Sequence, residues 1–443
     1  MPAQFKVDVL VIGAGPTGIG AAVQLQQSDV DHLVVEAAAE PGGMARSMHD
    51  KHGFTWDLGG HVIHSHFDCF DKAVATAGTP MRAVARNGYV WTGGALIPMP
   101  IQAQLSKLPT DLRPDLPSPN LASYYRNNFG SELARQFFEP HTFKMWAHPL
   151  EDLSHEWTSM RAGSGRRNVP PLGLAADQIR REQEFFPYPE GGTGRLWHDI
   201  VRTQVDGARL RLGASVVSLD AAAHRATLAD GSVIDYEACI STAPITKLLE
   251  WAGPAGVLGP DSQGAPVDTA RLVSSTVHAV GFGVRGDPPP ELADKTYLAS
   301  PDVDVPWYRA SVLSNYDPGN AGDGRWSVLC EVSSSRWRPV SHEAAVAGSR
   351  ASLERLGMNP AQIESTWSTQ LPMGYPLPTQ GRDEELRRID AGLRSKAILS
   401  RGRFGGWRYE SCNQDYSFAQ GVEAVAHLLD GSPEDVYWHP ERF

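Results

Sequence analysis

The first residues with a clear chemical role lie near the N-terminus and are suited to binding a dinucleotide. A hydrophobic run at residues 7–12 leads into Gly13, Gly15 and Gly18, and a second hydrophobic run ends at Glu36. Gly13 permits a tight turn, Gly15 lets the backbone approach a pyrophosphate, and Gly18 allows a helix to pack closely on the strand. The carboxylate of Glu36 is placed to hold a ribose hydroxyl group. This spacing predicts a strand, a glycine turn and a helix that together bind a dinucleotide.

A second glycine turn indicates which dinucleotide is bound. It lies at residues 40–47, where Gly42 and Gly43 are followed by Arg46. A nicotinamide dinucleotide has no need for this turn, whereas an extended flavin adenine dinucleotide (FAD) needs further amides and a cation near its pyrophosphate and ribityl chain. The alternative is a surface turn with a solvated arginine. We favour FAD.

The remainder of the cofactor domain is expected far away in the sequence. Residues 214–219 and 225–228 have the pattern of two strands, and residues 238–244 that of a buried strand ending at a proline. This arrangement resembles the later part of FAD domains of the glutathione-reductase and amine-oxidase type. A closing helix at residues 421–429 is expected to point amide donors at the flavin. We therefore expect an FAD-binding, Rossmann-like domain built from three discontinuous segments, residues 1–66, 190–267 and 393–443.

Two other regions are predicted between these segments. Residues 67–189 include an amphipathic helical stretch at residues 121–138, which favours a mostly helical substrate cap. Residues 268–392 change to short β-rich runs, which predict a mainly antiparallel sheet that closes the site. The runs are residues 272–280, 310–314 and 326–332. The predicted fold class is therefore α/β, with the cofactor domain, a helical cap domain and a β-sheet substrate domain.

Composition and charge exclude several classes of protein. The chain has 443 residues, of which 41% are hydrophobic and 21% charged, as in a globular enzyme of two or three packed units. The net charge of -11 argues against nonspecific binding to nucleic acid. No apolar run of about 18 residues predicts a membrane span, and the N-terminus enters the first strand without a signal sequence. We expect a cytoplasmic protein that binds neither nucleic acid nor membrane.

The cysteines and histidines do not predict a metal site. The 4 cysteines are widely spaced and lack a CxxC pattern, so neither a structural disulfide nor a zinc site is expected. His61, His64 and His66 lie close together, but no acid or cysteine cluster completes a coordination set.

Five blocks of sequence resemble a known family. They are residues 53–63 (GFTWDLGGHVI), 143–146 (FKMW), 191–194 (GGTG), 307–316 (WYRASVLSNY) and 403–415 (RFGGWRYESCNQD). These blocks are similar to UDP-galactopyranose mutase, especially its eukaryotic-type branch, and they occur in the same order over nearly the whole chain.

The resemblance implies an isomerase, a nucleotide-sugar pyranose/furanose mutase. Such an enzyme interconverts UDP-galactopyranose and UDP-galactofuranose, or a related nucleotide sugar, through attack of reduced flavin N5 on the anomeric carbon, with no net redox change. NADPH or NADH is the implied reductant and would use the substrate cleft, because no second glycine fingerprint marks a nicotinamide domain. A homo-oligomer remains open.

The resemblance also implies roles for individual residues. Arg309 and Arg161 would hold the diphosphate, because cationic donors suit a dianionic leaving group. Tyr375 and Tyr409 would hydrogen-bond the same diphosphate, and His61 would lie against the flavin and tune its N5 region. Without the resemblance, the arginines would be interpreted as surface ion pairs and the tyrosines as ordinary half-buried residues.

The expected site residues fall into three groups. The catalytic group is His61, Arg161, Arg309, Tyr375, Tyr409 and Asn413. The cofactor group is Gly13, Gly15, Pro16, Thr17, Gly18, Glu36, Gly43, Met44, Arg46, Ser47, Gly60, His61, Val217, Arg403, Asn413, Gln414 and Ser417. The substrate group is His64, Gln102, Thr142, Trp146, Arg161, Arg309, Tyr316, Tyr375 and Tyr409.

Five positions depart from the family pattern. His64 stands where the family has phenylalanine, and Met99 and Ile101 replace a tyrosine and an aromatic residue that would stack on uracil. Thr142 replaces an asparagine, and Ala299 replaces a tyrosine that binds diphosphate. Loss of a stack or a hydroxyl group costs on the order of 1 kcal/mol in binding. The nucleotide and the sugar therefore stay open.

Two other functions compete with the mutase. One is an amine-oxidase-like flavoprotein oxidase or desaturase, whose product is two electrons more oxidised than its substrate. The other is a non-catalytic protein that binds FAD or a nucleotide sugar.

Overall fold

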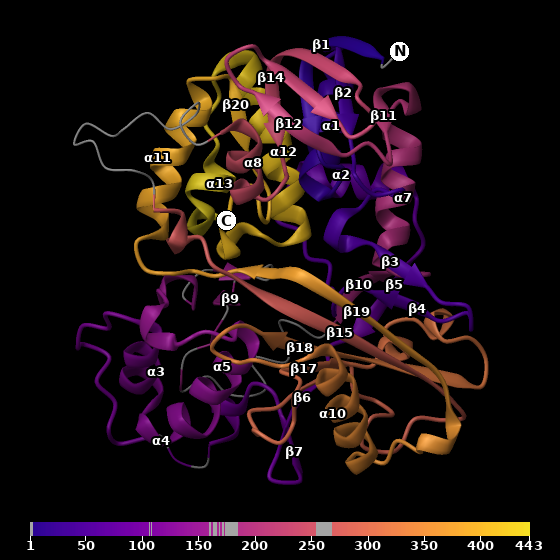
Figure 1. Ribbon diagram of the computed structural model, residues 1–443. Coiled ribbons are helices and arrows are strands. Elements are labelled where there is room, and N and C mark those ends of the chain that lie inside the picture. Colours follow the sequence, from indigo (N-terminus) through magenta and orange to yellow (C-terminus); the bar gives the residue numbers. More distant parts are fainter. Residues whose placement is uncertain are drawn as a thin grey trace.

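The computed structural model describes residues 3–443 apart from residues 106, 108, 159–160, 163–165, 168, 171, 173–184 and 254–267. Two large sheets lie one above the other in the view of Figure 1, with helices around the first sheet and a further group of helices beside the second.

The first sheet combines segments that are far apart in the sequence. Six of its seven strands have the order β11, β2, β1, β14, β13, β12, and β20 pairs with β14. β1 is parallel to β2 and β14, and β14 is parallel to β20, whereas β12, β13 and β14 pair antiparallel. The strands are β1 (Gln4–Ile12), β2 (His32–Val35), β11 (Leu210–Arg211), β12 (Val216–Asp220), β13 (Arg225–Leu228), β14 (Val233–Ser241) and β20 (Ile398–Ser400). The parallel core and the β12–β13 hairpin confirm the expected α/β fold class.

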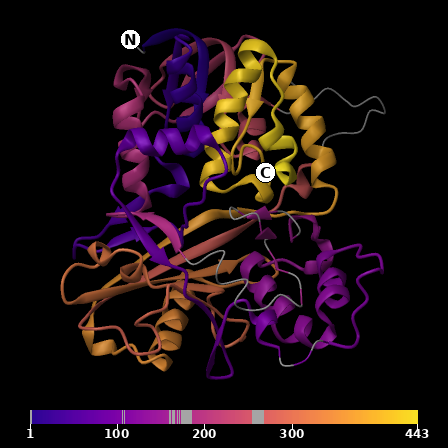
Figure 2. The ribbon, with the colours of Figure 1, turned by 180° about the vertical axis from the view of Figure 1, so that it is seen from behind.

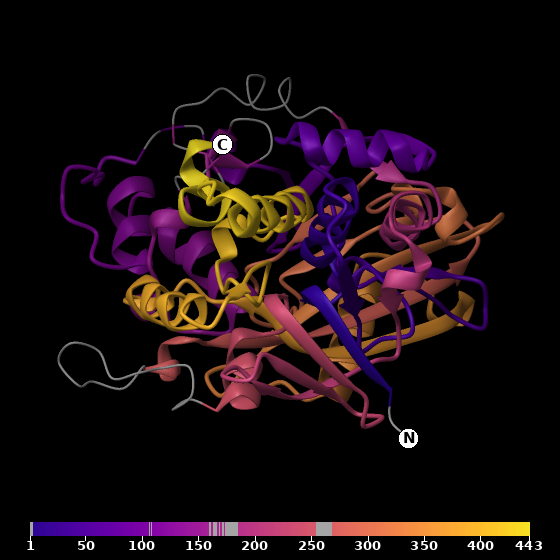
Figure 3. The ribbon, with the colours of Figure 1, turned by 90° about the horizontal axis from the view of Figure 1, so that it is seen from above.

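Two helices from opposite ends of the chain pack closely at this sheet. α1 (Pro16–Gln27) and α12 (Gln414–Asp430) lie side by side (Figures 2 and 3). A Cβ atom on Gly20 would lie 2.2 Å from Phe418 O, and one on Gly421 would lie 2.0 Å from Thr17 O. The close contact therefore requires glycine on both helices.

Further helices surround the first sheet. α2 (Asp68–Ala77) packs on α7 (Thr193–Gln204), where the rings of Phe70 and Trp197 are 6.1 Å apart. The others near this sheet are α8 (Ile245–Ala252), α11 (Arg382–Arg394) and α13 (Asp435–Trp438). No helix in the described ranges is long and apolar enough to cross a membrane.

The second sheet is the predicted β-rich region with an added hairpin. Its order is β19, β15, β18, β17, β16, β6, β7, and only the β16–β6 pair is parallel. The strands are β6 (Gly88–Thr92), β7 (Ala95–Pro98), β15 (Ser274–Arg285), β16 (Tyr297–Ala299), β17 (Arg309–Ser311), β18 (Arg325–Ser334) and β19 (Ile363–Pro376), and α10 (His342–Arg355) packs on β15. The strand runs expected at residues 272–280 and 326–332 are confirmed, whereas the run expected at residues 310–314 ends as a strand at Ser311, because Leu313–Asn315 forms a 3-10 turn. The hairpin comes from residues 67–189, so this segment is not helical throughout, and the domain boundaries stay a prediction.

A helical group lies beside the second sheet. It contains α3 (Leu121–Phe129), α4 (Ser131–Leu133), a π-helical segment at Ala134–Phe138 and α5 (Glu139–Trp146). The helical stretch expected at residues 121–138 is interrupted at Gly130, whose φ of +81° no other residue adopts easily. Aromatic side chains fill its core, including Tyr125 and Phe138, whose rings stack at 5.0 Å.

Short two-stranded sheets complete the described structure. They are β3 (Ser47–His49) with β4 (Thr55–Asp57), β5 (Met81–Ala85) with β10 (Phe185–Pro189), and β8 (Arg161–Ala162) with β9 (Arg166–Arg167).

Candidate active site

Two glycine turns face each other at the first sheet. Gly13 has φ +100°, and a Cβ atom there would lie 2.1 Å from a threonine hydroxyl, so this turn requires glycine. The Gly42 N–H of the second turn donates to Ala14 O at 2.7 Å. A Cβ atom on Gly43 would lie 3.0 Å from the Cα atom of Gly15. The two turns therefore approach each other through backbone alone, as expected where main-chain amides bind a pyrophosphate.

Charged side chains flank these turns as the sequence predicts. Glu36 Oε2 accepts from Ala14 N–H at 2.7 Å, and Oε1 accepts from Ala38 N–H at 2.8 Å. These bonds hold the carboxylate beside the first turn, where a ribose is expected. Arg46 Nε donates to Gly43 O at 2.9 Å, so this cation lies at the second turn. The donor set therefore fits a dinucleotide.

Some other residues of the predicted cofactor group lie near the glycine turns, and one does not. A Cβ atom on Gly18 would lie 1.8 Å from the carbonyl oxygen of the first turn, so the start of α1 packs directly on that turn. Ser47 Oγ donates to Asp57 at 2.5 Å and accepts from Gly194 N–H at 2.8 Å, which joins β3 to α7. Val217 is 50% exposed on β12, so its side chain is turned to solvent rather than to the glycine turns.

The N-terminus of α12 supplies the last part of the cofactor group. The helix begins at Gln414 rather than at residue 421, with Asn413 as its N-cap residue. Gln414 Oε1 accepts from Trp197 Nε1 at 2.7 Å, and Ser417 N–H donates to Asn413 O at 2.8 Å. The closing helix is therefore longer than the expected residues 421–429 and begins within the family block at residues 403–415.

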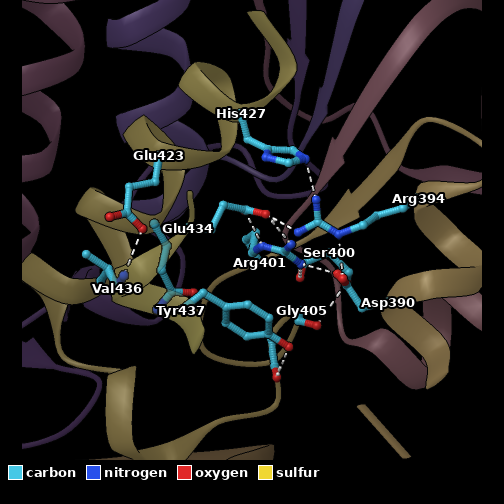
Figure 4. Close-up of polar contacts among 12 residues, drawn as sticks. Asp390, Arg394, Ser400, Arg401, Gly405, Glu423, His427, Glu434, Val436 and Tyr437 are labelled. Atoms are coloured by element: carbon cyan, nitrogen blue, oxygen red, sulfur yellow. Dashed lines mark hydrogen bonds and ion pairs between the residues drawn. The ribbon is translucent and has the colours of Figure 1, made fainter. Parts of the chain in front are cut away.

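A buried ion-pair cluster fixes the turn that precedes α12 (Figure 4). Arg401 is fully buried and donates to Glu434 at 2.6 and 2.7 Å and to Asp390 at 2.8 Å. The guanidinium outweighs the effect of burial and holds the pKa of Glu434 below its ordinary value. Gly402 follows directly, and a Cβ atom there would lie 2.4 Å from Thr17 Oγ1. The cluster thus presses this turn against the start of α1.

A second ion pair stands on the second sheet. Glu331 on β18 is 3% exposed and accepts from Arg309 Nε and Nη2, the latter at 2.8 Å. It also accepts from Tyr308 Oη at 2.9 Å and from Gly60 N–H at 3.3 Å. Burial alone would raise the pKa of Glu331, but Arg309 lowers it below its ordinary value, so the carboxylate is charged. The side chain of Arg309 stays 30% exposed.

Aromatic residues extend from this pair. Tyr308 donates to Glu331, so Tyr375 Oη donates to Tyr308 Oη across their 3.2 Å contact. The Tyr409 ring lies 5.9 Å from that of Tyr375 and 4.6 Å from that of Trp146. Burial raises the pKa of Tyr409, so its hydroxyl group stays protonated. The rings of Trp146, Tyr375 and Tyr409 form one aromatic wall.

Arg403 connects this wall to the turn before α12. Its guanidinium lies 4.8 Å from the Tyr375 ring centroid, and Nη2 donates to Gly374 O at 2.7 Å. Nη1 contacts Cys412 Sγ at 3.3 Å. Arg403 therefore lies between the second sheet and α12.

His61 lies against the same ion pair from the other side. A Cβ atom on Gly59 would meet Glu331 Oε1 at 3.2 Å and His61 Nε2 at 3.7 Å. Burial lowers the pKa of His61, although Asp57 and Glu331 oppose this shift. His61 is therefore neutral near pH 7, and its Nδ1 is buried without a partner among the described residues. The structure thus brings His61, Arg309, Tyr375, Tyr409, Trp146 and Arg403 together.

Other predicted substrate residues are engaged elsewhere. Gln102 donates to Pro170 O at 2.8 Å, and Thr142 donates to Tyr125 Oη at 3.2 Å in the helical core. Tyr316 is 2% exposed and packs among aromatic rings. Arg161 forms part of β8, and its side chain lies outside the described part of the structure.

Of the positions that depart from the family pattern, Ala299 lies beside the ion pair. Ala299 pairs with Arg309 across β16 and β17. His64 Nε2 lies 3.5 Å from Arg86 Nη2, and burial followed by Arg86 lowers the pKa of His64 to about 4. Met99 and Ile101 pack against the helical core.

Sequence analysis did not single out two residues of the site. Glu331 is the one charged residue in the predicted strand at residues 326–332, and an acid within a buried strand could have indicated a charged partner. Tyr308 lay within a quoted family block, next to Arg309, but carried no signal of its own.

Comparison with known proteins agrees with this arrangement. Residues 16–404 match the family described as flavin containing amine oxidoreductase. A crystal structure of reduced UDP-galactopyranose mutase is 33% identical with a TM-score of 0.88, and the match covers 98% of each chain.

More distant proteins share the fold. Cyclohexylamine oxidase from Brevibacterium oxydans is 17% identical with a TM-score of 0.69, over 95% of this chain and 98% of the oxidase. The lycopene-forming phytoene desaturase of Pseudescherichia vulneris is 25% identical over 66% of this chain, and the match spans 66% of the desaturase. The chain belongs to the flavin-containing amine oxidoreductase family and is, within it, a UDP-galactopyranose mutase-like flavoprotein.

Proposed function

We propose that the protein is an FAD-dependent nucleotide-sugar pyranose/furanose mutase that interconverts UDP-galactopyranose and UDP-galactofuranose or a related nucleotide sugar. One observation carries the proposal: Arg309 is held on the buried Glu331 beside His61, in a chain that matches the reduced mutase over 98% of its length. An isomerase that moves a diphosphate away and back needs such a fixed cation.

The cofactor is proposed to lie between the glycine turns and α12. Gly15 and Gly43 would approach the pyrophosphate, Glu36 the ribose, and Arg403 and Asn413 the flavin end. When bound and reduced, FAD supplies the electron pair that forms a bond to the anomeric carbon of the sugar.

Arg309 is proposed to bind the diphosphate. Its Nε and Nη2 atoms are engaged with Glu331, and Nη1 has no hydrogen bond to any described residue. The guanidinium is therefore oriented by one edge and free to donate from the other. Tyr409 would add a neutral hydroxyl donor, and Tyr375 would add another once its hydroxyl group turns from Tyr308 to the ligand. The leaving diphosphate would then stay in place while the sugar ring opens and closes.

Trp146 and His61 are proposed to shape the sugar pocket. Trp146 is fully buried at the tyrosine wall, and its Nε1 has no partner among the described residues. The neutral imidazole of His61 would offer Nδ1 near the flavin without adding a positive charge. Both groups keep polar atoms available to a ligand while excluding water.

NADPH or NADH is proposed as the reductant. Anaerobic mixing of the oxidised protein with either nucleotide would bleach the flavin absorbance at a saturable rate. Absence of bleaching with both would remove them as reductants without affecting the mutase proposal.

The test is an anaerobic incubation with UDP-, GDP- and dTDP-linked hexoses, with and without dithionite, followed by chromatography of pyranose and furanose forms. An isomer of unchanged mass that forms only with reduced flavin supports the proposal and identifies the nucleotide. Turnover that persists with the flavin held oxidised contradicts it.

An oxidase or desaturase is the second candidate, since the family model and the phytoene desaturase favour that chemistry. It predicts a product lighter by two hydrogens in aerobic samples. Nucleotide-sugar binding without turnover under reducing conditions would indicate a non-catalytic binding protein.

A further inference from the structure

Lys144 is a buried cation with an unusual set of partners. The side chain is 4% exposed, and Nζ donates to the main-chain oxygens of Ser300 at 2.7 Å and Asp302 at 3.0 Å. Among the described residues, no carboxylate forms an ion pair with it. Burying a lysine is costly, so a position that uses one to hold two carbonyl groups calls for a reason beyond packing.

The carbonyl groups belong to the segment that leads into the diphosphate arginine. Residues 300–308 connect β16 to β17, which begins at Arg309. The far end of the segment is held similarly, because Arg338 Nη2 donates to Pro306 O at 2.7 Å and His141 Nε2 lies 3.2 Å from Tyr308 O. Lys144 and His141 both come from α5, so this helix contacts the segment near both of its ends.

The opposite side of α5 carries the aromatic wall. Trp146 follows Lys144 by two positions, which places the two side chains on different faces of the helix. The end of α5 is joined to β18, where Ser333 Oγ donates to Met145 O at 2.7 Å and Ser335 Oγ donates to Ala147 O. The helix is therefore fixed between the Trp146 wall and the segment that carries Arg309.

We propose that Lys144 is a positioning residue that sets the spacing between Trp146 and Arg309 and thereby the affinity for the diphosphate of the nucleotide sugar. The inference rests on the proposed function and adds to it, since Lys144 itself touches neither the ion pair nor the tyrosines. The two main-chain hydrogen bonds of Nζ offset the free-energy cost of burying the amine and hold the segment that leads to Arg309.

The charge of Lys144 supports a distinctive pH dependence. Burial and then Arg338 lower the pKa of Lys144 to about 7, whereas Asp302 and Asp304 oppose the shift. Two neighbouring groups do not neutralise the charge of Lys144. Asp304 forms an ion pair with Arg355, and His141 is neutral near pH 7 because burial lowers its pKa to about 4. The neutral amine has two N–H donors for two carbonyl groups. Above pH 7 the contact is therefore matched, and below pH 7 it holds an unpaired charge.

The test measures binding of UDP to the oxidised, FAD-loaded protein by calorimetry at pH 6 and pH 8. Lys144→Met removes both hydrogen bonds and is expected to raise Kd about 10-fold at pH 8. At pH 6 the ratio of variant to wild-type Kd is expected to fall to about 3-fold, because the wild-type contact is itself weakened. Lys247→Met, an exposed lysine on α8, is the control and should leave the ratio near one.

Conservative variants separate positioning from general stability. Lys144→Arg retains donors but stays charged, so its own Kd, unlike that of wild type, should not change between pH 6 and pH 8 through ionisation at this position. If Lys144→Met does not give folded flavoprotein, Lys144→Gln can donate to the carbonyls and should raise Kd about 3-fold at pH 8. A ratio near one at both pH values for Met and Gln, while wild type binds UDP, overturns the inference alone. A ratio that is raised equally at both pH values overturns only the pH dependence. Failure of wild type to bind UDP overturns the proposed function with it.

Discussion

Replacing Arg309 with lysine tests the diphosphate site most directly. The guanidinium uses two nitrogens on Glu331, with Nη2 at 2.8 Å from Oε1, and keeps Nη1 for a ligand. Lysine keeps the charge but has a single nitrogen, which cannot span both carboxylate oxygens and a phosphate. Loss of one charge-assisted hydrogen bond costs about 1.5 to 3 kcal/mol, which corresponds to roughly 10- to 150-fold in affinity. We therefore expect Kd for UDP to rise within that range.

The assay is calorimetric binding of UDP to the oxidised, FAD-loaded variant, followed by anaerobic mutase kinetics. The flavin spectrum and the thermal midpoint show that the variant is folded. Arg325→Lys is the matched control, because Arg325 lies on the same sheet but donates to His52 O at 2.8 Å and contacts Phe54. A change in Kd of less than about 3-fold for Arg309→Lys, equal to that of the control, would refute the reasoning.

Three further predictions concern cofactor binding and stability. Gly43→Ala should weaken FAD binding at least about 10-fold in a fluorescence titration, because the added Cβ atom would lie 3.0 Å from the facing turn. Gly94→Ala is the control, because Gly94 also has a positive φ but open space around it, and this variant should bind FAD normally. Arg401→Met should lower the free energy of unfolding in urea by about 3 kcal/mol, because buried Glu434 loses Arg401 and keeps only Arg394 as a cationic partner. A loss below about 1 kcal/mol would contradict this. Burial raises the pKa of Glu423 to about 7, so the folded state keeps a proton that the unfolded chain releases near the ordinary pKa of glutamate. The thermal midpoint should therefore fall as the pH rises to 7. Glu423→Gln should flatten this pH dependence of the thermal midpoint, and an unchanged slope would contradict the prediction.

Local patterns predicted several strands of the two large sheets but missed others, such as β6, β7 and β19, and they set element ends less well. The runs at residues 225–228 and 326–332 correspond to β13 and β18 because strand formers alternate or cluster between turn residues. The helical stretch at residues 121–138 is interrupted at Gly130, where the backbone has φ +81°. The closing helix begins at Gln414, because its first turn is stabilised by tertiary contacts such as the Trp197 hydrogen bond and not by propensity.

The candidate site was predicted residue by residue where a family block carried it. Arg309, His61 and Tyr409 were singled out in this way, and the structure brings them together. Glu331 was not, because an acid in a strand gives no indication of its partner until β17 and β18 pair. Thr142 was expected at the substrate but donates to Tyr125, since helix packing turns it to the core.

The sequence by itself determined the two glycine turns and indicated the family. Gly13, Gly15 and Glu36 act through backbone geometry and short-range spacing, which can be recognised in the sequence without knowledge of the tertiary structure. Only the tertiary structure decided the electrostatics of the site. Arg309 and Glu331 are 22 positions apart, and Lys144 meets Ser300 across 156 positions. Their charge states and orientations depend on burial and on partners that chain folding alone brings within hydrogen-bonding distance.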